Sequence, residues 1–253
     1  MRSLLTMFCT TLILLLGSTE GWSGDFQKGA DAYLKGDYAT ALREWNPLAN
    51  QGDAQAQFQL GWMYSKGEGV SEDDQEAVKW YRLAAEQRHA HAQYNLGLMY
   101  DSGWGVPKDD KEAVKWFRRA AEMGFAEAQH NLGVMYQKGR GVPENDQEAV
   151  KWYRHAAEQG AAAAQSNLGW MYANGKGVPE DDTEAVKWYA LAAAQGLAKA
   201  QHNLGLMYDN GEGVPKDDKE AVTWYRRAAE QGDVFAQNNL GFMYEYGEGV
   251  LQN

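Results

Sequence analysis

Apolar residues recur at helical spacing in two kinds of segment that alternate along the chain. In the first kind, which begins near Asp53, Ala56, Leu60 and Met63 fall at i, i+4 and i+7, on one face of a helix. The second kind carries an apolar face with small residues at alternate turns: Ala77, Trp80, Tyr81, Ala84 and Ala85. We call the two segments helix A and helix B. The alternation typical of β-strands appears nowhere, so the pattern predicts an all-α fold.

Three short strings repeat in one register, and every step is 36 residues. Leu-Gly-x-Met-Tyr lies in helix A and begins at Leu60, Leu96, Leu132, Leu168, Leu204 and Leu240. Glu-Ala-Val-x-Trp lies in helix B and begins at Glu76, Glu112, Glu148, Glu184 and Glu220. Gly-x-Gly-Val begins at Gly67, Gly103, Gly139, Gly175, Gly211 and Gly247. Because a single short helix pair cannot bury enough apolar surface, the repeat predicts an α-solenoid of stacked 36-residue antiparallel helix pairs.

Each helix has a predicted start and stop. Gly67 and Gly69 end helix A, since glycine tolerates the left-handed conformation at a helix C-terminus. Asp73 stands three residues before Glu76, which predicts a capping box at the start of helix B. Acidic clusters such as Asp109-Asp110 recur at the same place in the repeat. They therefore indicate helix capping rather than calcium binding.

The two ends of the chain depart from the repeat. Residues 25–52 predict an atypical N-terminal helix pair, residues 53–233 five full repeats, and residues 234–253 a C-terminal half repeat without its helix B. One face of the last helix is then left uncovered. We expect fraying there, or pairing with another molecule, including self-association.

Residues 1–23 have the pattern of a signal peptide. Arg2 precedes an apolar run from Leu4 to Leu16, which is short for a membrane span, and small residues follow. Cleavage is expected between Thr19 and Gly24, although an uncleaved membrane anchor is the alternative. Cleavage would remove the single cysteine, Cys9, and leave a periplasmic or secreted chain with no stable membrane insertion.

Charge and composition exclude several classes of function. The chain has 24 basic and 35 acidic residues, a net charge of -11, whereas a nucleic-acid binder needs a basic surface. The five histidines lack metal-ligand spacing and are interpreted as surface residues. No Gly-x-Ser-x-Gly or Ser-x-x-Lys string is present. We expect no cofactor, no metal, no nucleic acid and no enzyme activity.

The repeated strings resemble the Sel1-like repeat, a relative of the tetratricopeptide repeat. One unit carries the resemblance in residues 128–136, 139–143 and 148–154. The resemblance implies a right-handed superhelix that acts as an adaptor in protein complexes, for bacterial members often in the cell envelope, secretion or signalling. A cysteine-rich branch is linked to penicillin binding and weak β-lactamase activity. Since no repeat here contains cysteine, that activity is not carried over.

Four helix A positions vary between repeats while their neighbours stay fixed, and their i, i+3, i+7, i+11 spacing places them on one face. In the first full repeat these first to fourth positions are Gln55, Phe58, Trp62 and Lys66. Superhelices of this kind line their concave groove with helix A. We predict that partner-binding residues lie there: Phe58, Trp62, Tyr94, Leu98, His130, Ser166, Trp170, His202, Asn238 and Phe242. The second and fourth positions are the stronger candidates, because Trp62, Leu98 and Trp170 have the alternative of packing against the next unit.

The favoured interpretation is a non-enzymatic scaffold of the cell envelope, or a secreted one, that binds a partner peptide or helix in this groove. A binder of cell-wall glycan or peptidoglycan is one alternative, because tryptophan and tyrosine can stack on sugar rings. A weak penicillin-interacting hydrolase, like the cysteine-rich branch, is the other.

Overall fold

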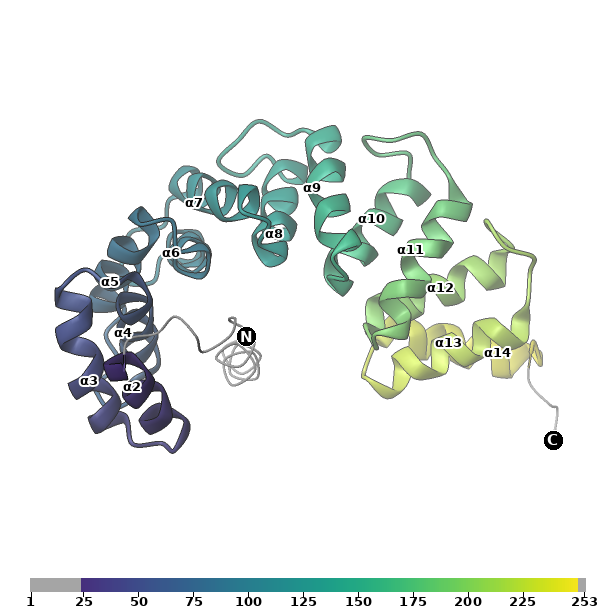
Figure 1. Cartoon of the computed structure of the whole chain (residues 1–253). Helices are drawn as coiled ribbons and strands as arrows, with labels where there is room; N and C mark the ends of the chain where they lie inside the picture. The colour runs from purple at the N-terminus through teal and green to yellow at the C-terminus, as the bar shows by residue number, and fades with distance from the viewer. Residues whose placement is uncertain (1–23, 250–253) are drawn as a thin grey trace. The chain divides into compact units, whose positions relative to one another are not determined.

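The computed structural model describes residues 24–249, and these form α-helices α2 to α14 with no strand between them (Figure 1). The predicted signal peptide, residues 1–23, and the last residues, 250–253, lie outside the described part. The helices are α2 (Gly24–Leu34), α3 (Tyr38–Asn50), α4 (Ala54–Lys66), α5 (Asp74–Glu86), α6 (Ala90–Ser102), α7 (Asp110–Glu122), α8 (Ala126–Gln137), α9 (Asp146–Glu158), α10 (Ala162–Ala173), α11 (Asp182–Ala194), α12 (Ala198–Asn210), α13 (Asp218–Glu230) and α14 (Val234–Tyr246).

The all-α class and the repeated helix pairs are confirmed. Helix A corresponds to α4, α6, α8, α10, α12 and α14, and helix B to α5, α7, α9, α11 and α13. The described residues divide into two compact units, one that ends at Ala120 and one that begins at Ala121, and each is described by itself. Within a unit, consecutive helices pack on one another, for example α4 on α5 and α8 on α9.

In every helix A from α4 to α12, a glycine makes room for an aromatic ring of the following helix B. A Cβ added to Gly133 would lie 2.7 Å from the ring of Tyr153, and one added to Gly61 would lie 2.6 Å from Tyr81. The rings that fill this space are fully or almost fully buried. The Leu-Gly-x-Met-Tyr string is therefore a packing signal: its glycine sets the close approach of the two helices.

Helix B begins at the predicted caps, but without the full capping box. The Asp73 carboxylate accepts a hydrogen bond from Glu76 N, and Asn145, Asp181 and Asp217 make the same bond in their repeats. In a full capping box the Glu76 carboxylate would accept a hydrogen bond from the Asp73 N–H. Here the Asp73 N–H donates to the carbonyl oxygen of Tyr64 instead (2.9 Å). Glu76 instead pairs with Lys79.

A row of buried glutamines connects neighbouring helix pairs. Gln129 Nε2 donates to the Ala121 carbonyl (3.1 Å), and Gln159 Nε2 donates to Gln129 Oε1 (2.7 Å). The same two bonds recur at Gln57, Gln165 and Gln201. The first bond gives a carbonyl of the last helical turn a side-chain donor in addition to a backbone N–H of the turn that follows. The second bond satisfies the amide oxygen of the buried glutamine.

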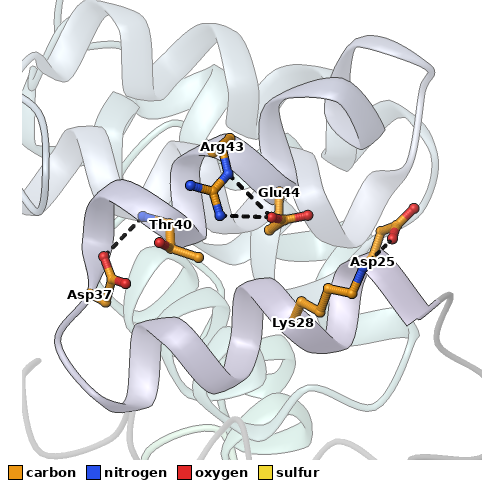
Figure 2. A network of polar contacts seen from close by, with 6 residues as sticks. All are labelled: Asp25, Lys28, Asp37, Thr40, Arg43 and Glu44. Carbon is orange, nitrogen blue, oxygen red and sulfur yellow. Dashed lines mark hydrogen bonds and ion pairs between the residues drawn. The ribbon is translucent and has the colours of Figure 1, made fainter.

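The N-terminal pair α2–α3 is held by a small aromatic core. Phe26 stacks on Trp45 with ring centroids 5.6 Å apart, and both are buried. Its surface carries short-range polar contacts: Lys28 pairs with Asp25 at 3.2 Å, and Thr40 N donates to Asp37, which caps α3 (Figure 2). Hydrogen bonds from Thr40 lower the pKa of Asp37. Exposed ion pairs of this kind add little stability, so the aromatic core fixes the pair.

The last described helix, α14, leaves an apolar face exposed. Phe235, Phe242 and Tyr246 are 68%, 49% and 68% exposed, and a Cβ added to Gly241 would meet no atom within 4 Å.

None of the helices between residues 24 and 249 is long and apolar enough to cross a membrane.

Candidate binding surface on the helix A faces

The first unit has a hollow between α4, α6 and the turn after α6. We call it hollow 1. It is lined by Trp62, Ser65, Lys66, Asp74, Tyr81, Asn95, Leu98, Met99 and Trp104. Two tryptophans, an amide and a lysine therefore face one small depression.

Trp62 is fixed in hollow 1 by polar partners at its edge. Its Nε1 donates to the Tyr33 hydroxyl (3.1 Å), and that hydroxyl donates to Glu68 Oε2 (2.6 Å). The Lys66 ammonium lies 4.9 Å from the centroid of a Trp62 ring. Trp62 itself is only 6% exposed, so it forms the floor of the hollow rather than a projecting side chain.

The second unit has a larger hollow across α8, the start of α9, α10 and the start of α12. We call it hollow 2. It is lined by Val134, Gln137, Lys138, Glu144, Asp146, Asn167, Trp170, Lys176 and Lys199. Trp170 is 36% exposed, and Gln137 Oε1 accepts a hydrogen bond from the buried Tyr153 (2.7 Å). The exposed tryptophan lies beside three cationic side chains.

The turn after helix A contributes a residue to each hollow. Trp104 in hollow 1 and Lys176 in hollow 2 both occupy the variable position of Gly-x-Gly-Val. The following glycine has positive φ (66° at Gly105, 70° at Gly177) and packs against the carbonyl of the first residue of the preceding helix B. A side chain at Gly105 or Gly177 would therefore displace the turn and the residue it presents.

The predicted third position lines both hollows. Trp62 and Leu98 face hollow 1, whereas Val134 and Trp170 face hollow 2. The fourth position contributes Lys66 and Lys138. The structure thus groups the same two register positions twice, once in each unit.

The predicted second position lies mainly against the aromatic residue of helix B. Phe58 and Ser166 are each 2% exposed, so they are core positions, and we leave them out of the candidate surface. Tyr94, His130 and His202 are partly buried, with ring centroids 6.0, 5.8 and 5.9 Å from Phe117, Tyr153 and Tyr225. Asn238 and Phe242 are exposed on α14.

The interpretation of all five histidines as surface residues is wrong for four of them. Only His155 is exposed. Burial lowers the pKa values of His91, His130 and His202, and it lowers that of His89 to about 4. His89 and His91 both pack on Phe58, with His89 stacked at 4.8 Å, because His89 precedes α6 as its cap. Among the described residues, no group of three or more His, Cys, Asp or Glu could hold a metal ion.

Sequence reasoning missed the polar residues of the hollows. Asn95 and Asn167 are nearly constant between repeats and so resembled structural positions, yet they line hollows 1 and 2. Trp104 and Lys176 lie in turns rather than on helix A. The sequence signal that could have revealed these two residues was the variable residue between the two constant glycines of Gly-x-Gly-Val, which changes from Glu68 to Trp104 and Lys176.

Comparison with known proteins places these features in a family. A family model described as Sel1 repeat matches residues 54–89, 90–125, 126–160, 162–197, 198–233 and 234–253. The comparison with curated proteins gave no match.

Two solved structures are similar over most of the chain. A Sel1 repeat protein from Oxalobacter formigenes is 36% identical, with a TM-score of 0.83 over 91% of this chain and 92% of that chain. The protective antigen c5321 of uropathogenic Escherichia coli is 43% identical, with a TM-score of 0.81 over 84% of this chain but only 45% of that chain. The repeated strings, the helix pairs and these matches agree: the chain belongs to the Sel1 repeat family.

Proposed function

We propose that this chain is a non-enzymatic scaffold of the cell envelope, or a secreted one, that binds a peptide or helix of a partner protein on its helix A faces. Sel1 repeat proteins are generally protein-interaction scaffolds, and the family is typically non-enzymatic. In the first unit the proposed contacts are Leu98 and Trp62 of hollow 1, and in the second unit, taken by itself, they are Trp170 and Val134 of hollow 2.

One observation carries this proposal. Third-position residues of helix A, which the repeat does not constrain, line a hollow in each unit. Aromatic side chains in partly enclosed depressions supply much of the energy of protein binding, since they bury a large apolar area with few rotatable bonds.

An affinity pull-down from envelope extract tests the proposal. The Leu98→Ala/Trp170→Ala variant alters one residue in each hollow. The matched control, Leu83→Ala/Leu191→Ala, removes two apolar side chains that are 44% and 45% exposed on helix B, again one in each unit. We expect the wild-type chain and the control to retain the same protein and the hollow variant to lose it. Equal retention by both variants would reject the helix A surface.

The envelope part of the proposal is supported by the residue pattern of positions 1–23. Cell fractionation followed by N-terminal sequencing tests it. A chain that begins between Thr19 and Gly24 in the periplasm or medium supports export, whereas an intact N-terminus in the cytoplasm contradicts it.

A glycan ligand is the second candidate, and the exposed tryptophan of hollow 2 favours it. Trp170 is 36% exposed and shares the hollow with the amide of Asn167, a combination that suits stacking on and hydrogen bonding to sugar rings. Retention of cell-wall fragments without any protein in the same pull-down would favour this candidate over the scaffold.

A further inference from the structure

Three lysines in hollow 2 lack the glutamate partner that four lysines on helix B have. On helix B, Lys79, Lys115, Lys151 and Lys187 each pair with a glutamate three residues before them. Lys138, Lys176 and Lys199 make no ion pair with any residue in the described range 24–249. All three are exposed and line the same hollow.

The repeat does not require lysine at these positions. The position of Lys176 carries glutamate in three other repeats: Glu68, Glu212 and Glu248. The position of Lys199 carries Glu127 in the repeat two units earlier. Packing therefore accepts either sign of charge at the positions of Lys176 and Lys199, whereas the position of Lys138 carries lysine or an uncharged residue in the other repeats.

The lining also contains two carboxylates, which limit the excess charge. Glu144 and Asp146 lie at the rim formed by the start of α9, so three cations face two anions. Unpaired like charges held close together repel one another, and an anionic ligand relieves this repulsion. Trp170 and Val134 supply an apolar surface beside them, and Asn167 supplies an amide.

These features together favour one ligand chemistry. We propose that hollow 2 binds an acidic peptide segment whose carboxylates pair with Lys138, Lys176 and Lys199 and whose apolar side chain packs on Trp170. This proposal rests on the proposed function. The net charge of -11 repels acidic peptides at long range. A preference for such peptides must therefore come from this local cluster.

The test uses two fluorescein-labelled peptides that share one tryptophan and two leucines. One carries glutamates and the other glutamines at the same positions. Fluorescence anisotropy measures their binding to the purified chain, to Lys138→Gln/Lys176→Gln/Lys199→Gln, and to a matched control, Lys35→Gln/Lys111→Gln/Lys219→Gln. The control lysines are exposed, make no ion pair with described residues and lie outside hollow 2, and both variants change the net charge equally.

We expect the glutamate peptide to bind about tenfold more tightly than the glutamine peptide, which corresponds to three exposed ion pairs. Added salt and the hollow 2 variant should remove the difference, whereas the control variant should keep it. Equal affinity for the two peptides, or an equal loss in the control variant, overturns the acidic preference.

The same experiment separates the two proposals. If both peptides bind equally well and Trp170→Ala weakens both, the helix A scaffold stands and the acidic preference falls. If neither peptide binds while soluble peptidoglycan fragments do, both proposals fall and the glycan candidate replaces them.

Discussion

Each helix A contains one glycine, and the surroundings of that glycine decide how a Gly→Ala substitution changes the free energy of unfolding. Gly133 faces the buried ring of Tyr153, whereas Gly241 on α14 faces open space. Gly133→Ala should lower the free energy of unfolding by about 1–3 kcal/mol through overpacking. Gly241→Ala should raise it by about 0.5–1 kcal/mol, because alanine favours the helix. Urea denaturation measures both, and equal effects of the two substitutions would contradict this account of helix approach.

At the same scale, one repeat uses a histidine as a helix cap. His89 Nδ1 accepts from Ala92 N (3.2 Å), and His89 Nε2 lies 2.8 Å from Gln55 Oε1. Burial and the neighbouring His91 lower its pKa to about 4. The unfolded chain then binds the proton of this imidazole more strongly than the folded chain does. The contribution of His89 to the free energy of unfolding is therefore largest above about pH 6.5. It should fall between pH 6.5 and pH 4, by up to about 1.4 kcal/mol per pH unit.

His89→Asp is the matched control for this pH dependence. Asp53 and Asp233 already cap their helices by the equivalent bond, from Ala56 N and Ala236 N. The aspartate variant should keep the cap and show a shallower fall between pH 6.5 and 4 in thermal melts. An unchanged pH profile would show that His89 is not the group responsible.

At the scale of the elements, the buried glutamines show why a polar residue can be constant in a repeat. Gln93 makes the first bond of the row, to the Ala85 carbonyl (3.0 Å), but its Oε1 has no partner. The residue thirty positions later, where the other repeats have the donor glutamine, is Met123. The chain thus contains its own example of an incomplete pair.

Gln159→Met should reproduce that incomplete pair within the second unit. It removes the donor to Gln129 Oε1 (2.7 Å) and leaves a buried acceptor without a partner. We expect the free energy of unfolding to fall by about 1–3 kcal/mol in urea denaturation. Gln147→Met, at an exposed position on the same helix, is the control and should change it little. If the two variants are equally stable, the glutamine row does not stabilise the fold.

The sequence predicts the helix pairs and their starts well, but it predicts individual side-chain contacts poorly. The 36-residue strings predicted the helix pairs, and Asp73 and its equivalents predicted the start of helix B. The prediction of a full capping box was wrong because the carbonyl of Tyr64, at the end of the preceding helix A, accepts the hydrogen bond from the Asp73 N–H. Variation at the second helix A position also misled, since the space beside the helix B ring accepts Phe58 and Ser166 alike. Side chains that face another element are decided by packing, which one sequence does not display.

At the scale of the whole molecule, we propose that the exposed apolar face of α14 mediates self-association. The glycines of the other helix A segments each meet a ring of helix B, whereas Gly241 meets none and Phe235 and Phe242 are exposed. Sedimentation velocity should show association that increases with concentration. Phe235→Ser/Phe242→Ser should abolish it, and Leu83→Ser/Leu191→Ser should not. A monomer at every concentration, or an equal effect of both variants, would contradict this use of α14.

The central claim is that partners bind on the helix A faces of both units, and site-specific photo-crosslinking tests it most directly. A photoreactive phenylalanine is placed in turn at Leu98 and Trp170, and at Leu83 and Leu191 on helix B, and envelope extract is irradiated. The account predicts one shared partner crosslinked from positions 98 and 170 and absent from positions 83 and 191. Crosslinks from the helix B positions alone would place the binding surface on helix B and contradict the account.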